Sequence, residues 1–350
     1  MDSYSKKLEI GCSKKEPKEP KLISYIFPLF WISIFLLLPL FLRSPIWLHL
    51  MILIYFYTYL SLSWNIVGGI AGQLSLGHAA FALIGAYVST LMLINWNISP
   101  WIGMFAGGIG AGILSVIIGY PCFRLRGAYY ALATLAFAEL IRVFIINTDR
   151  FMGLEIRGAR GILLPLMGHA PKYFQFVDKK YYYYIILGFC IILILSLVTI
   201  SKSRLGYYLL AIRENQEAAE SLGIKVDLCK LSAGVISAFF TAIGGVFYAQ
   251  YVLFISAQSL GAIHISLEMA FIAIIGGKGT IMGPIVGAFL MTLLAELTRD
   301  YLGGGGTYLG LHFVLYGIVL MLVVKFMPSG IIYPIRSLYQ KLLTFSVLVR

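Results

Sequence analysis

The stretch YYYYIILGFCIILILSLVTI, residues 181–200, decides the class of the protein. Its twenty consecutive uncharged residues match the length that an α-helix needs to cross the hydrocarbon core of a bilayer. Strands of a membrane β-barrel span about ten residues and alternate in polarity, unlike this continuous run. The stretch therefore predicts a transmembrane helix.

Similar runs recur along the chain, which is 60% hydrophobic and 12% charged, with a mean hydropathy of +0.88. This composition predicts an all-α, polytopic membrane protein with no water-soluble domain. At about twenty residues a crossing, the chain has about ten transmembrane helices. We place them at residues 22–42, 46–67, 78–95, 101–119, 128–147, 181–200, 232–256, 263–276, 284–302 and 308–326. The eighth is short, so its end is a candidate re-entrant hairpin.

The charge pattern predicts how the chain lies in the membrane. Most basic residues fall in the predicted segments on one side, which the positive-inside rule assigns to the cytoplasm together with both termini. We expect a basic tail at residues 1–21, a membrane domain at 22–335 and a second tail at 336–350. The net charge of +12 is thus assigned to orientation and anionic lipid, not to nucleic acid. The run at 22–42 is longer than the apolar core of a signal peptide, so we expect it to be retained.

Several kinds of chemistry receive no support from the sequence. The four cysteines show no CxxC spacing and no cluster of His and Cys occurs, so neither a metal site nor a cofactor is expected. We find no grouped nucleophile, base and orienting residue, and hence expect no catalytic residue. The glycine-rich segment at 67–87, VGGIAGQLSLGHAAFALIGAY, lacks the GK[ST] of a phosphate loop.

That same segment is a candidate part of a substrate path. Glycines at membrane depth permit broken helices, which line substrate paths in transporters. Our candidates are four residues of this segment and one acidic residue further on: Gly72, Gln73, Ser75, His78 and Glu139. A tight helix contact between small residues explains the glycines equally well.

Three acidic residues lie in or near predicted spans, where an unpaired charge costs on the order of 3 kcal/mol. Glu139 shares a helix face with Arg142, so charge neutralisation is the simple account and a proton or ion relay the alternative. Glu268 and Glu296 lie close enough to span ends for water to reach them.

The polar stretch SRLGYYLLAIRENQEAAESLGIKVDLCK, residues 203–230, interrupts this apolar chain on the predicted cytoplasmic side. Helical spacing predicts one amphipathic helix over about 205–222 that carries Arg213, Glu217 and Glu220 on a single face. Gly223 is a candidate helix C-cap. The pattern alone favours a surface connector slightly over a rigid element that passes movement from a soluble partner to the membrane.

Five parts of the sequence resemble a known family in the expected order. The motif EAAxxxG, here Glu217, Ala218, Ala219 and Gly223, is similar to the loop of ATP-binding-cassette (ABC) importer permeases that contacts their ATPases. Residues 72–87, 124–142, 254–288 and 315–331 resemble LivM-type permeases for branched-chain amino acids. The likeness covers residues 46–335, but MGLEIRGARGI at 152–162 replaces a glycine-rich stretch often seen in the family.

The resemblance implies an ABC importer permease fold and a transport subunit for leucine, isoleucine and valine in the cell membrane. Implied partners are a second, LivH-like permease, two cytoplasmic ATPases and an extracytoplasmic binding protein. It also implies that the helix at 205–222 couples to the ATPases through Arg213, Glu217, Ala218, Ala219, Glu220 and Gly223. Two alternatives stay open, a permease for urea or short amides and an ion-coupled secondary transporter that uses Glu139.

Overall fold

The computed structural model describes residues 39, 44–123, 125–151, 153–168, 170–302, 311–327 and 330–334. The predicted tails at 1–21 and 336–350 lie outside these residues, and so does nearly all of the first predicted span, 22–42.

Every other predicted span is a helix. The corresponding helices are α3 (Pro45–Asn65), α4 (His78–Trp96), α5 (Pro100–Cys122), α6 (Ala128–Ile146), α7 (Lys179–Lys202), α10 (Val226–Val252), α11 (Ile263–Gly277), α12 (Met282–Leu302) and α13 (Leu311–Phe326). Their bounds agree with the predicted spans within a few residues, except that α10 begins at Val226 instead of 232. The polar residues Asp227 and Lys230 belong to its first turns.

The expected number of ten spans is not confirmed. Among the described residues, six helices are long and apolar enough to cross a membrane, or seven if α11 and α12 form one bent span. These two helices meet at 115° across the short break at 278–281. The chain is nevertheless a helical membrane protein, because those helices carry the long apolar runs that define the class.

Local signals fix several helix ends. The side chain of Asp178 accepts a hydrogen bond from the backbone N–H of Lys180 at 3.0 Å and so caps the start of α7. Pro100 begins α5, where its missing N–H costs nothing. Asn97 ends α4 in the left-handed conformation, with φ of 51°.

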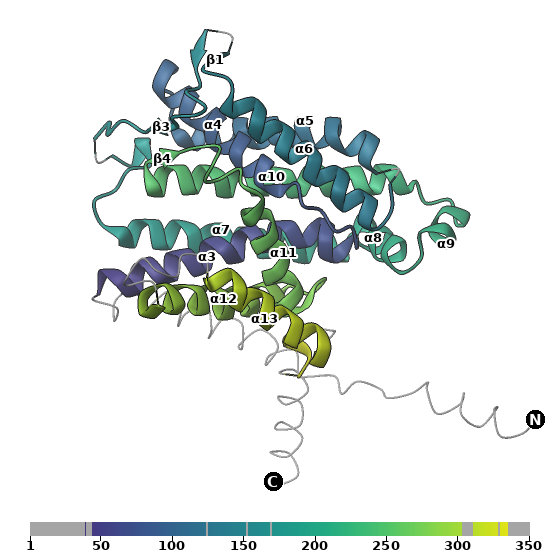
Figure 1. Ribbon diagram of the computed structural model, residues 1–350. Helices are drawn as coiled ribbons and strands as arrows, with labels where there is room; N and C mark the ends of the chain where they lie inside the picture. Colours follow the sequence, from purple (N-terminus) through teal and green to yellow (C-terminus); the bar gives the residue numbers. More distant parts are fainter. Residues whose placement is uncertain are drawn as a thin grey trace, which may run out of the picture. The chain divides into compact units, whose positions relative to one another are not determined.

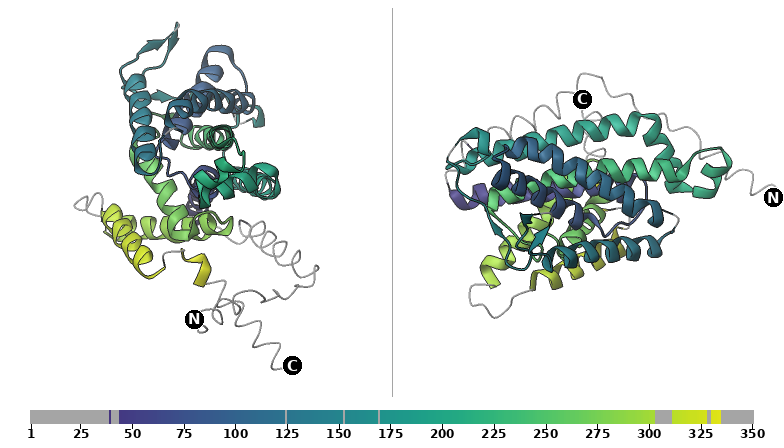
Figure 2. Two further views of the ribbon diagram at one scale, coloured as in Figure 1. Left: turned by 90° about the vertical axis from the view of Figure 1, so that its right-hand side faces the viewer. Right: turned by 90° about the horizontal axis from the view of Figure 1, so that it is seen from above.

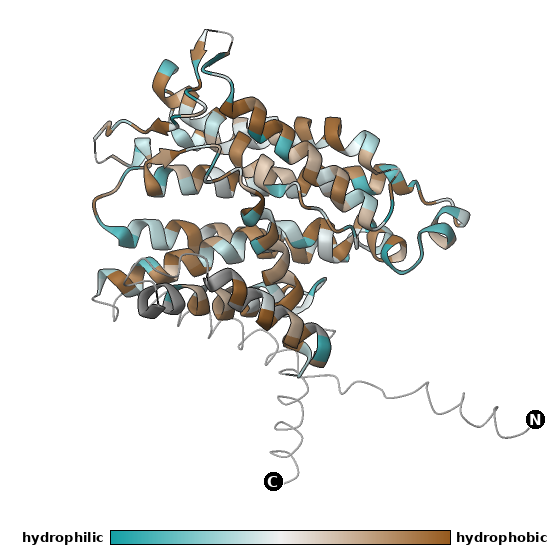
Figure 3. Ribbon diagram, viewed as in Figure 1, coloured by the Kyte–Doolittle hydropathy of each residue, from teal (hydrophilic) through white to brown (hydrophobic). Residues whose placement is uncertain are grey.

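The helices form successive layers (Figures 1 and 2). Helices α4, α5 and α6 lie on one side of α10, and α12 and α13 lie on the other side, beyond α3 and α7. The brown, apolar residues of Figure 3 run along the lengths of these helices, while teal, polar residues gather at their ends. Helix α11 crosses from the layer of α10 towards α12.

The packing of α4 against α5 and α10 depends on small side chains. A Cβ atom at Gly85 would lie 2.4 Å from the carbonyl oxygen of Ala242, and one at Gly245 would lie 2.0 Å from that of Ala82. In a membrane the hydrophobic effect does not drive helices together, so close backbone approach and van der Waals contact hold them. Glycine and alanine at these positions therefore set the distance between α4 and α10.

The described strands all lie at one end of the helices, opposite the end that carries α8 and α9 (Figure 1). Strand β1 (Arg150–Phe151) pairs antiparallel with β2 (Leu154–Glu155), with Arg150 opposite Glu155. Arg157 and then Arg150 hold the pKa of the Glu155 carboxyl below its usual range. Strand β3 (Ile162–Leu163) pairs with β4 (Phe254–Ile255), so the long loop after α6 is joined to the end of α10.

We expect Gly85→Ala to loosen the α4–α10 contact and to lower the free energy of unfolding by about 1–3 kcal/mol, because the added methyl group overfills a closed contact. The matched control is Gly188→Ala in α7, where nothing lies within 4 Å of the new methyl group. That change should stabilise the helix by up to about 1 kcal/mol. Unfolding in mixed micelles of increasing denaturing-detergent content measures both, and equal stability of the two variants would contradict the prediction.

Candidate functional site

The polar stretch forms two helices, so the prediction of one helix over 205–222 is wrong. Helix α8 spans Arg204–Glu214 and α9 spans Gln216–Ser221. Between them Asn215 is extended, with φ of −156° and ψ of 109°, and its side chain accepts the N–H of Ala218 at 3.0 Å. Asparagine favours such caps over helix interiors, because its side chain competes for backbone hydrogen bonds.

The break also separates the charges that were expected on one face. Arg213 turns towards the membrane helices, and only 33% of its side chain is exposed. Glu217 forms an exposed ion pair with Arg126 at 2.8 Å, and Glu220 accepts a hydrogen bond from Gln216 at 2.8 Å. Of these three predicted coupling residues, Glu217 and Glu220 form only exposed side-chain bonds, whereas the partly exposed Arg213 also bonds to a membrane helix.

Helix α9 is fixed to the body of the protein by side-chain bonds at its start and by the burial of Ala219. Ala219 is 2% exposed, while Ala218 lies on the surface. The buried ammonium of Lys230 in α10 donates to the side chain of Gln216 at 2.8 Å. Gly223 has φ of +82° and ends the helix, which confirms the predicted glycine stop. Helix α9 therefore projects from the membrane helices and is bonded to them at its first turn (Figure 1).

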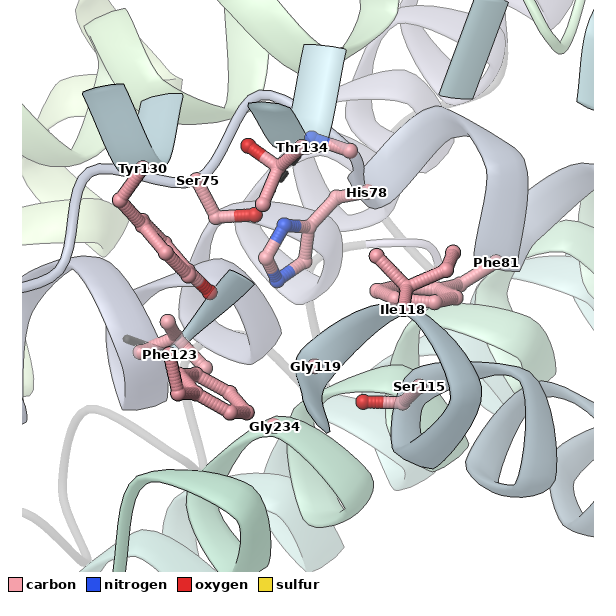
Figure 4. Close-up of a pocket in the computed structure, with 12 residues that line it drawn as sticks. Ser75, His78, Phe81, Ser115, Ile118, Gly119, Phe123, Tyr130, Thr134 and Gly234 are labelled. Carbon is pink, nitrogen blue, oxygen red and sulfur yellow. Dashed lines mark hydrogen bonds between the residues drawn. The ribbon is translucent and has the colours of Figure 1, made fainter. Parts of the chain in front are cut away.

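Ser75 and His78 lie together in a small pocket with a cavity volume of about 20 Å³, enough for about one water molecule (Figure 4). Helices α5, α6 and α10 contribute its other walls, including Ser115, Phe123, Tyr130, Thr134 and Gly234. The sequence interpretation did not find these residues, because they lie singly within or at the end of apolar helices. Serine and threonine inside such runs are the one signal that pointed to them.

A hydrogen-bond network fixes the imidazole of His78. Its Nε2 lies 2.8 Å from the hydroxyl of Ser237, and that hydroxyl donates to the carbonyl of Ser63 at 2.6 Å. Since the serine proton is used for the carbonyl, Nε2 carries the ring proton and Nδ1 is an acceptor. Within the described part of the chain, Nδ1 is buried without a partner. The pocket thus presents one free acceptor to a small polar donor.

The other predicted path residues lie elsewhere. Gly72 packs against the side chain of Arg213, and Gln73 lies in the same turn, with its side-chain oxygen buried and unpaired within the described residues. Glu139 forms an ion pair with Arg142 on α6 and is partly exposed. The structure therefore brings together only two of the five candidates, and a relay through Glu139 stays a prediction.

Glu268 differs from its prediction. Only 8% of the residue is exposed, so water does not reach it as expected. The hydroxyl of Tyr57 hydrogen-bonds the carboxyl group, whose second oxygen is buried without a partner in the described part of the chain. No group of three or more His, Cys, Asp or Glu residues among the described residues is arranged to hold a metal ion.

Known sequences match most of the chain. Residues 46–324 match the family model described as "Branched-chain amino acid transport system / permease component". Over 264 residues the chain is 30% identical to the high-affinity branched-chain amino acid transport system permease protein LivM of Escherichia coli (strain K12), covering 70% of this chain and 62% of that relative. The match thus spans less than two thirds of that relative's length.

Two further relatives match over more of their length. The LivH permease protein of the same E. coli strain is 26% identical over 293 residues, which cover 79% of this chain and 91% of the relative. A probable LivM permease of Methanocaldococcus jannaschii is 24% identical over 328 residues, which cover 81% and 92%. No solved structure matches the chain.

We expect Ser237→Ala to lower the free energy of unfolding by about 1–3 kcal/mol, because it leaves the buried imidazole N–H of His78 unpaired. The control is Ser196→Ala on α7, whose exposed hydroxyl bonds only to the carbonyl of Ile192 in its own helix. This control should change stability by less than about 0.5 kcal/mol. Detergent-induced unfolding measures the free energy of unfolding of both variants. An unchanged value for Ser237→Ala would show that the hydrogen-bond network does not stabilise the position of His78.

Proposed function

The chain belongs to the family of branched-chain amino acid transport permeases, and from this we propose that it is a membrane-spanning subunit of an ATP-driven importer of leucine, isoleucine and valine. The observation that carries the proposal is the match of residues 46–324, which runs through the membrane helices and includes α8 and α9.

The arrangement of polar and apolar residues supports this proposal. The long helices supply a membrane body, while α8 and α9 project from one end and carry the exposed carboxylates of Glu217 and Glu220. The sequence has no GK[ST] phosphate loop, so partner ATPases would hydrolyse the ATP. We propose that α9 seats in a groove of such an ATPase.

The proposed mechanism is alternating access. When ATP closes the paired ATPases, α9 moves with them, and the ion pair of Glu217 with Arg126 and the hydrogen bond from Lys230 to Gln216 carry the movement to α5, α6 and α10. An amphipathic segment without such anchors would slide on the membrane surface instead. The membrane helices then open towards a loaded binding protein at the end that carries the strands.

The proposed assembly contains four kinds of subunit. A second, LivH-like permease completes the path, two cytoplasmic ATPases drive it, and an extracytoplasmic binding protein delivers the solute. Because the relatives are named LivM and LivH, a pair of related permeases is the natural arrangement. We place α8, α9 and both termini in the cytoplasm from the distribution of basic residues.

The substrate is tested on the binding protein, which recognises the solute before the permease does. We expect the binding protein encoded beside this chain to bind leucine, isoleucine or valine by calorimetry. Tight binding of urea or a short amide, with no binding of these amino acids, would support the amide alternative instead.

The class of transporter is tested by reconstitution. We expect uptake of labelled leucine only when vesicles contain the complete complex with binding protein and ATP. Uptake by the isolated chain with an ion gradient and no ATP would instead support a secondary transporter that uses Glu139.

We expect the double variant Glu217→Ala, Gly223→Val to lower uptake per ATP hydrolysed by roughly 5- to 150-fold, the usual range of coupling between sites. The first change removes the carboxylate, and the second places a β-branched residue at φ of +82°, which distorts the end of α9.

The matched control is Glu155→Ala, Gly153→Val at the opposite end, where Gly153 has φ of +83° and equally open surroundings. This control should keep the ATPases bound and their hydrolysis rate unchanged. The coupling role of α9 is wrong if the Glu217, Gly223 variant transports normally.

A further inference from the structure

The side chain of Arg213 connects α8 to the broken end of α3. After Asn65 the helix widens into the π-helix η1 (Ile66–Ile70). The Nη1 atom of Arg213 donates to the carbonyl oxygen of Gly69 in η1 at 3.2 Å. The other side of the guanidinium contacts the carboxylate of Glu214, with Nη2 to Oε1 at 3.0 Å. The cation is therefore held between its own helix and a membrane helix.

The end of η1 offers Arg213 a carbonyl group because the helix stops there. The N–H of Ala71 bonds to the carbonyl of Ile66 and that of Gln73 bonds to the carbonyl of Val67, so the pattern of an α-helix is already lost. The last carbonyls of a helix have no donors within the helix and attract cations. The guanidinium of Arg213 donates a hydrogen bond to one of these carbonyls, and its positive charge interacts favourably with the negative end of the helix dipole.

Two glycines make room for the guanidinium. A Cβ atom at Gly72 would lie 2.5 Å from Cγ of Arg213, and one at Gly279 would lie 2.5 Å from its Nη1. Both glycines have positive φ, +69° and +78°, which disfavours any other residue. Arg213 thus lies against the segment after η1 and the turn between α11 and α12, and a third of its side chain stays exposed.

Asn65 joins these two segments to each other. Its side-chain oxygen accepts the N–H of Gly279 at 2.9 Å, and its side-chain nitrogen donates to the carbonyl of Thr280 at 2.8 Å. Three elements therefore meet here: α8 through Arg213, the end of α3 through Asn65 and Gly69, and the α11–α12 turn through Gly279 and Thr280. Each is bonded to another by a side chain with directional donors.

We propose that Arg213 is a positioning residue that makes α8, the end of η1 and the α11–α12 turn move as one unit. A displacement of α8 then reaches α3 and the α11–α12 pair directly, without passing through the bulk of the bundle. What displaces α8 rests on the proposed function, whereas the link itself does not. This assigns Arg213 to the membrane side of α8, in contrast to the ATPase side that the family resemblance implied.

The link is tested by a distance measurement in the purified complex. Spin labels are placed on cysteines introduced at Tyr207 in α8 and at Lys278 beside the α11–α12 turn, both exposed positions. Pulsed electron paramagnetic resonance then gives the distribution of distances between them, with and without ATP. In the wild-type background we expect one narrow distribution that is the same in both conditions.

Three substitutions separate a directional link from simple packing. Arg213→Met keeps the length of the side chain but removes the donors, so we expect a broader distribution and a loss of uptake per ATP of roughly 5- to 150-fold. Arg213→Lys retains a cation that reaches the Gly69 carbonyl, and we expect it to restore a narrow distribution. The control Arg204→Met changes an exposed arginine of the same helix and should match the wild type.

The link is overturned if Arg213→Met and Arg213→Lys give the same distribution, or if Arg213→Met matches Arg204→Met. If Arg213→Met fails to assemble, Gly279→Ala tests the same contact from the opposite side and should broaden the distribution. A wild-type complex with a narrow distribution but no ATP-driven uptake would reject the proposed function and leave the link supported.

Discussion

Backbone groups at membrane depth must find hydrogen-bond partners within the protein, because each unsatisfied group costs several kcal/mol there. Continuous helices meet this constraint by themselves, but in this chain the helical path is interrupted after Ile70 and again after Gly277. At these breaks side chains form the hydrogen bonds that the backbone groups can no longer form within a helix. Trp64 donates to the carbonyl of Ser75 at 2.7 Å, and Thr134 accepts the N–H of Leu76 at 3.1 Å. Trp64 and Thr134 thus satisfy backbone groups of the segment that follows the first break.

The same constraint explains where the unusual residues of the site lie. The break between α3 and α4 opens the chain over residues 71–77, and the ring of His78 begins the next helix beside it. Ser266 on α11 accepts the N–H of Ala79 at 2.8 Å, so the start of α4 is bonded across to another helix. The pocket beside His78 and the contact of Gly72 with Arg213 therefore both lie at the segment 71–77 that joins α3 and α4. This segment brings the pocket inside the bundle close to the end that carries α8 and α9.

Close packing of small residues supports this arrangement mechanically. Where Gly85 meets Ala242, backbones touch, so α4 and α10 have little freedom to slide independently. Helix α9 is bonded to α10 through Lys230, and α8 is bonded to η1 through Arg213. In the proposed importer, a partner that moves α8 and α9 would thus act on two different groups of membrane helices. These two attachments would allow α10 and its neighbours to move relative to α3 and the α11–α12 pair.

The sequence by itself determined the helical membrane class, the positions of the described long helices and the glycine stop at Gly223, because these depend on local apolar length and backbone preference. It also determined the family, through motifs that keep their order along the chain. Only the tertiary structure decided that Asn215 divides the polar helix, because a cap competes with the helix through one side-chain bond. It alone bonded Arg213 to the end of η1, buried Glu268, and left Glu139 out of the pocket of His78, since these outcomes depend on which helices become neighbours.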